Sequence, residues 1–64
     1  MMKLTRAEAI KRDRTSGEVY VSETPSGQYG VYGNDSGYCY GKYKDQDEAE
    51  SAAGSITDEI LNED

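Results

Sequence analysis

Residues 18–44, EVYVSETPSGQYGVYGNDSGYCYGKYK, decide the fold of this 64-residue chain. Valine and tyrosine alternate with small or polar residues along much of this stretch, which is the period-two pattern of half-buried strands. Two breaks divide it, at residues 25–27 (PSG) and 34–37 (NDSG), and both have the composition of turns. The spacing predicts three strands, the second over about residues 28–33 and the third over 38–44, in an antiparallel meander.

A short helix is predicted before the strands. Thr5 and Glu8 have the spacing of a capping box, in which each residue bonds the backbone amide of the other. The helix should run over about residues 6–14, with Ala7 and Ile10 as its apolar stripe.

A longer helix is predicted after the strands, beginning at a second capping box formed by Asp45 and Glu48. Gly54 in its interior should destabilise it by about 1 kcal/mol relative to alanine, and we expect this glycine to allow close approach to the sheet. The helix should pack on one sheet face through a stripe of apolar residues, namely Ala49, Ala52, Ala53, Ile56 and Ile60. The predicted fold class is therefore α+β, a single α-β-β-β-α domain over residues 1–64.

The charges are distributed unevenly along the chain. Thirteen acidic and seven basic residues give a net charge of -6, but residues 1–14 carry five cations and two carboxylates, so the remaining residues carry -9. Residues 45–64 contain eight carboxylates and no lysine or arginine. Direct binding of nucleic acid by this part of the chain is disfavoured, because affinity for phosphates comes mainly from cationic side chains. An acidic surface indicates a basic partner or serves solubility.

No residue pattern indicates catalysis. The chain has no histidine, so its single cysteine, Cys39, has no imidazole to activate it, and we expect it to be a buried strand residue. The glycines lack the lysine and hydroxyl residue of a P-loop, and residues 45–48 lack the spacing of a calcium loop. We expect neither enzyme activity nor a cofactor or metal. No apolar run resembles a signal peptide or a membrane span, which predicts a cytoplasmic location.

Two features point to binding. Tyrosines interleaved with Gly, Ser and Asn resemble antibody contact surfaces, and those on the open sheet face should contact a partner; ordinary cross-strand pairing is the alternative. The candidates are Tyr20, Tyr32, Tyr38 and Tyr40, with Tyr43 belonging to the same set. The second feature is the acidic C-terminal helix, which would span about 30 Å with roughly one carboxylate per 4 Å, near the 3.4 Å phosphate spacing of one DNA strand. Its candidate contact residues are Asp47, Glu48, Glu50, Asp58 and Glu59; a solvated helix face is the alternative.

This combination of a compact acidic chain, a Tyr/Gly-rich meander and a carboxylate-rich helix resembles small phage-encoded inhibitors of host defence, such as anti-CRISPR proteins and other DNA mimics. The run Asp45-x-x-Glu48-Ala49-x-x-Ala52-Ala53 after three strands is also similar to bacterial sheet-plus-helix modules. The first resemblance implies that the chain occupies the basic, nucleic-acid-binding groove of a partner in the host cytoplasm. The basic N-terminal segment departs from the uniformly acidic character of a DNA mimic. The competing hypothesis is a housekeeping interaction module or a homodimer that covers its tyrosines with a second copy.

Overall fold

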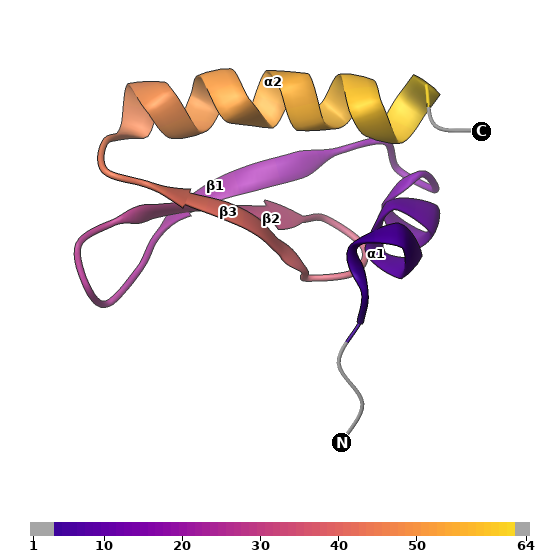
Figure 1. Cartoon of the computed structure of the whole chain (residues 1–64), viewed down its shortest axis with the longest axis horizontal. Coiled ribbons are helices and arrows are strands. Elements are labelled where there is room, and N and C mark those ends of the chain that lie inside the picture. The colour runs from indigo at the N-terminus through magenta and orange to yellow at the C-terminus, as the bar shows by residue number, and fades with distance from the viewer. Residues whose placement is uncertain (1–3, 63–64) are drawn as a thin grey trace.

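The computed structural model describes residues 4–62 and has the predicted α+β architecture. Its elements are α1 (Arg6–Asp13), β1 (Val19–Glu23), β2 (Tyr29–Gly33), β3 (Cys39–Tyr43) and α2 (Gln46–Asn62). The three strands form one antiparallel sheet in the order β1-β2-β3. In Figure 1, α2 lies along one side of the sheet and α1 lies near the C-terminal end of α2.

Local signals in the sequence begin both helices where expected. The Thr5 hydroxyl accepts a bond from the Glu8 amide at 3.2 Å, and the Glu8 carboxylate accepts one from the Thr5 amide at 3.0 Å, so the first capping box is confirmed. At the start of α2, the Asp45 carboxylate accepts a bond from the Glu48 amide at 2.9 Å. Gly37, with φ of 71°, occupies the left-handed conformation that the turn between β2 and β3 requires.

The core lies between α2 and the sheet. Val21 lies opposite Val31 in the register, and Tyr29 lies opposite both Glu23 and Tyr43. Because paired residues of neighbouring strands share a face, these positions together turn valines and two tyrosines toward α2. The buried cluster confirms the predicted stripe of α2, and it consists of Ile10, Val31, Ala49, Ile56 and Ile60, with Ala52 and Ala53 packed against it.

The predicted stripe of α1 is partly wrong. Ala7 is exposed, whereas Ala9 and Ile10 are buried and Asp13 completes the inward side. These three residues are spaced by one and three positions, so they share one side of the helix. The inward stripe therefore includes a carboxylate, which no apolar pattern could predict.

The expected role of Gly54 is also wrong. The residue is exposed, and a Cβ atom placed on it would meet nothing within 4 Å. It lies on the outer side of α2, so the close approach of helix and sheet is provided instead by alanines, with Ala49 completely buried.

Replacing Gly54 with alanine should therefore stabilise the protein. Alanine loses less backbone entropy in a helix interior, and the open space around Gly54 removes any steric penalty. We expect an increase of about 1 kcal/mol in the free energy of unfolding, measured by urea denaturation. A decrease would show that the outer side of α2 at this position is occupied by another part of the protein.

Candidate binding surfaces

The two predicted binding features lie on opposite sides of the sheet. Side chains alternate along a strand, so Tyr20 and Tyr32, which lie opposite each other, point away from the face that Val21 and Val31 share with α2. The exposed carboxylates of α2 lie on the side of that helix that is turned away from the sheet. A single flat partner surface can therefore contact the acidic helix or the outer tyrosines, but not both.

We call the first surface the acidic surface of α2, and it consists of Asp47, Glu48, Glu50 and Asp58, all exposed. At about 100° per residue, Asp47 and Asp58 point in nearly the same direction, opposite the buried stripe, and Glu48 and Glu50 flank this line. Three of the four lie within the first turns of α2, and Asp58 lies about 12 Å beyond Glu50 along the axis. The carboxylates thus form a cluster and an outlier on one side of the helix, and not the even row that close mimicry of a phosphate backbone would need.

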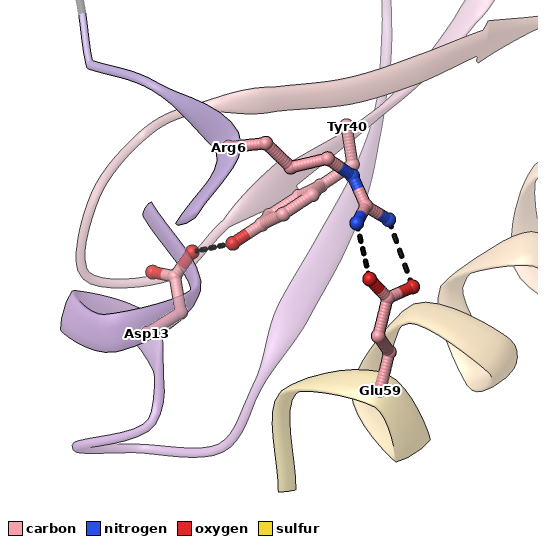
Figure 2. Close-up of polar contacts among 4 residues, drawn as sticks. All are labelled: Arg6, Asp13, Tyr40 and Glu59. Atoms are coloured by element: carbon pink, nitrogen blue, oxygen red, sulfur yellow. Dashed lines mark hydrogen bonds and ion pairs between the residues drawn. The ribbon is translucent and has the colours of Figure 1, made fainter. Parts of the chain in front are cut away.

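Glu59 does not belong to this surface as predicted. Its carboxylate forms a two-pronged ion pair with the guanidinium of Arg6, with Nη2 at 2.8 Å from Oε1 and Nη1 bonded to Oε2 (Figure 2). The Arg6 hydrogen bond lowers the pKa of Glu59, and Glu59 in turn raises the pKa of Arg6. Glu59 is therefore engaged within the fold.

Two basic residues at the ends of α1, Arg6 in its first turn and Arg14 at its C-cap, form bonds within the molecule. Besides the pair between Arg6 and Glu59, the Nε atom of Arg14 donates a hydrogen bond to the carbonyl oxygen of Ile60 at 3.1 Å. This carbonyl is in the last turn of α2, where backbone oxygens lack helical partners and a positive charge is favourable. Within residues 4–62 the pair of Arg6 with Glu59 is the one ion pair, so the acidic surface of α2 keeps its full negative charge.

The second surface, the tyrosine face, is the side of the sheet turned away from α2, and its strand residues are Tyr20, Ser22, Gly30, Tyr32, Cys39 and Lys42. The rings of Tyr20 and Tyr32 lie 5.6 Å apart between centroids with an angle of 30° between their planes. Cys39 lies opposite Tyr32 and is partly exposed, so the expected full burial of this thiol is wrong. Cys39 contributes to an accessible surface, and not to the core.

Tyr40 does not lie on the tyrosine face. The register pairs Val31 with Gly41 but Tyr32 with Cys39, which leaves Tyr40 as the extra residue of a β-bulge. A bulge redirects the side chain of its extra residue. The ring of Tyr40 consequently packs against the core, with Tyr38 in an edge-to-face contact at 5.0 Å and the Arg6 guanidinium 5.8 Å from its centroid.

Asp13 is the polar centre of the fold, and the sequence did not single it out. Its carboxylate is completely buried and accepts four hydrogen bonds. The donors are the Tyr40 hydroxyl at 2.5 Å, the Ser36 hydroxyl at 2.7 Å, and the amides of Asp35 and Ser36 at 2.9 and 2.7 Å. Figure 2 shows the Tyr40 ring between Asp13 and Arg6, with its hydroxyl turned toward Asp13. Asp13 thus ties α1 to β3 and to the turn that precedes it.

Gly33 provides the space for this carboxylate. A Cβ atom on Gly33 would lie 1.8 Å from the Asp13 Oδ2 atom. The one available signal was the position of Asp13, three residues after Ile10 and four after Ala9, on the inward side of α1.

The environment of Asp13 makes stability depend on pH. Burial tends to raise the pKa of its carboxyl group, but the bonds from Tyr40, Ser36 and the backbone outweigh this effect and lower the pKa below 3.8. A depressed pKa in the folded state stabilises the protein above the pKa of the unfolded chain, and this contribution is lost as pH falls through the folded value.

We therefore expect the urea midpoint to fall steeply below about pH 4. The Asp13→Asn variant cannot titrate at this position, so its midpoint should be lower at neutral pH and should change less on acidification. Asp58→Asn is the control, because it removes an exposed carboxylate on the outer side of α2 and should leave the pH dependence of the midpoint close to that of the wild type. Equal acid sensitivity of the wild type and Asp13→Asn would contradict this role of Asp13.

Within residues 4–62, no three acidic or cysteine side chains come together as metal ligands would. Neither helix in this part of the chain has the length and apolarity needed to cross a bilayer. Comparisons with protein-family models, with curated proteins and with solved structures find no significant match for the chain.

Proposed function

We propose that this protein is a small non-enzymatic binding protein that uses the acidic surface of α2 to occupy a basic, nucleic-acid-binding surface of another protein. The observation that carries the proposal is the unneutralised charge of α2. Asp47, Glu48, Glu50 and Asp58 are exposed on a rigid helix, and no lysine or arginine occurs from Asp45 to the end of the chain. A carboxylate cluster held by a fixed backbone binds cations with little loss of entropy on association.

The bonds that Arg6 and Arg14 form within the molecule support the same proposal. Arg6 and Arg14 contact the C-terminal part of α2 at Glu59 and Ile60, away from the first turns where three of the four carboxylates lie. The positive N-terminal segment is therefore compatible with an acidic binding surface. The ion pair between Arg6 and Glu59 uses a carboxylate outside that surface, so the charge of the surface is unchanged.

The class of partner follows from chemistry. Surfaces with high densities of lysine and arginine are typical of proteins that bind phosphate backbones, so an acidic helix competes with nucleic acid for them. A nucleic-acid-binding effector of host defence, which the resemblance to phage-encoded inhibitors suggests, is a partner of this kind. Because the tyrosine face lies on the other side of the sheet, it is not needed for this contact.

Two variants of equal charge test the proposal. Asp47→Asn/Asp58→Asn removes two of the four charges of the acidic surface of α2, whereas Glu23→Gln/Asp35→Asn removes two charges elsewhere, so both variants have a net charge of -4. Immobilised wild-type chain and the second variant should capture the same basic proteins from a lysate, and the first variant should lose them. The captured set should consist of nucleic-acid-binding proteins, and added duplex DNA should release them. Equal capture by both variants would refute the proposal.

A further inference from the structure

The tyrosine face is not covered by either helix. The α2 helix packs on the opposite side of the sheet, and α1 joins it there through Asp13, whose carboxylate lies over Gly33 on the core side. Tyr20 is 48% exposed, and Tyr32 and Cys39 are partly exposed. The sheet thus presents a tyrosine pair and a thiol to the outside of the molecule.

This face is also flat. A Cβ atom on Gly30 would lie 2.7–2.8 Å from the outer atoms of the Tyr32 ring, so the ring lies down over the glycine and does not project from the sheet. Flat sheet faces can approach one another to about 10 Å, the spacing of stacked sheets. Tyr32 therefore leaves room for a second sheet to pack on this side.

The tyrosine face carries a positive and a negative side chain at opposite corners, so the charges of two copies can match each other. Among strand residues the only charged side chain on it is that of Lys42, because Lys42 pairs with Gly30, whereas Glu23 pairs with Tyr29 on the core side. Glu18 precedes β1, and its carbonyl accepts a bond from the Asn34 amide at 3.1 Å, so the strand pairing and its alternation extend to Glu18. Glu18 then lies on the Tyr20 side, diagonally across from Lys42, with the tyrosine pair between them.

We propose that a second copy of the chain packs on the tyrosine face in a two-fold symmetric dimer, with Lys42 of each copy facing Glu18 of the other. A two-fold interface requires a self-complementary patch, and opposite charges at opposite corners of an aromatic centre satisfy this condition. The two-fold axis would lie between the two faces, perpendicular to the diagonal from Glu18 to Lys42. The strands of one sheet would then cross those of the other at a steep angle, as in orthogonal sheet packing.

The rest of the molecule favours this contact over others between copies of a chain with a net charge of -6. Pairing through the tyrosine face puts the two α2 helices on the outside, separated by about three layers of about 10 Å each. That separation exceeds the Debye length of about 8 Å at physiological salt, so the acidic surfaces do not repel each other strongly. Both acidic surfaces also remain free to bind partners, and the dimer does not depend on the function proposed above.

Sedimentation equilibrium over a concentration series, up to about 1 mM protein, tests the dimer. The wild type should reach twice the mass of the chain. Tyr20→Ala should raise the dissociation constant of the dimer by about tenfold or more, because it removes the exposed aromatic of the centre. Lys42→Glu and Glu18→Lys should each raise it by about fivefold through opposed like charges, and the double variant should restore the wild-type value.

Asp58→Lys, on the outer side of α2, is the matched control and should leave the dissociation constant unchanged. Circular dichroism verifies that every variant is folded, and all four positions are exposed. Reaction of Cys39 with a thiol reagent gives a second readout, since its rate should fall as the concentration of wild-type protein rises. A wild-type chain that stays monomeric throughout the series would overturn the proposal, leaving the face to a different partner. Failure of the double variant to restore dimerisation would overturn it as well.

Discussion

We expect Asp13→Ala to lower the free energy of unfolding by about 3–5 kcal/mol, because it leaves buried donors without their acceptor. Four donors point at this carboxylate, including the hydroxyls of Tyr40 and Ser36. A domain of 64 residues has a total stability of roughly 3–10 kcal/mol. The variant should therefore lose a large share of the total stability, as measured by circular dichroism and urea titration.

Two variants separate this effect from a general effect of charge. Asp35→Ala removes a neighbouring exposed carboxylate, whose contact is a bond from the Ser16 amide at 3.1 Å, and should change stability little. Tyr40→Phe removes one of the four donors and should have an intermediate effect, about 1–2 kcal/mol. If Asp13→Ala behaves like Asp35→Ala, Asp13 does not connect α1 to the sheet as described.

The second large effect is expected at Ile60, which is completely buried between α2 and the sheet. Ile60→Ala removes three carbon atoms from the core and leaves a cavity, so it should lower the free energy of unfolding by about 2–5 kcal/mol. Leu61→Ala is the matched control one residue further along the helix, because Leu61 is 57% exposed. Equal losses for the two variants would show that α2 faces the sheet through a different side.

Ile56→Ala should also lower the free energy of unfolding by leaving a cavity in the core. The loss should be slightly smaller, since Ile56 is 7% exposed and Ile60 is not exposed at all. The two isoleucines are the only large aliphatic residues of the inward stripe of α2. With alanines at the other stripe positions, the attachment of the helix to the sheet depends on these two side chains.

The architecture could be predicted because its signals are local. Alternation of valine and tyrosine defined the strands, glycine-containing turns separated them, and the capping residues Thr5 and Asp45 fixed where the helices begin. Each of these signals acts within a few residues and agrees with the global fold, so it could be recognised without knowledge of the tertiary contacts.

The errors arose where long-range contacts decide the outcome. Alternation alone places Tyr40 on the same side as Lys42, but a one-residue bulge turns it toward Asp13 and the core. Glu59 and Asp58 are neighbouring acidic residues that the sequence does not distinguish. Only Glu59 forms an ion pair, and its partner, Arg6, is 53 residues away in the chain. Gly54 could be judged only once the rotation of α2 about its axis was known.

The separation of the two candidate surfaces was also beyond the sequence. The sequence does not indicate which sheet face α2 covers, so it could not show whether the tyrosines and the carboxylates face the same partner. With α2 on the valine face, the tyrosine face and the acidic surface of α2 point in opposite directions. We therefore propose different contacts for them: a basic partner for the acidic surface, and a second copy of the chain for the tyrosine face.

The salt dependence of partner binding tests the central proposal most directly. The Debye length falls from about 10 Å at 0.1 M salt to about 3 Å at 1 M, so attraction between the acidic surface of α2 and a basic surface is screened over this range. For a protein captured from a lysate and then purified, calorimetry should show affinity that falls steeply with salt for the wild type and much less for Asp47→Asn/Asp58→Asn. Affinity that is independent of salt and identical for the two proteins would contradict the proposal that this helix takes the place of nucleic acid.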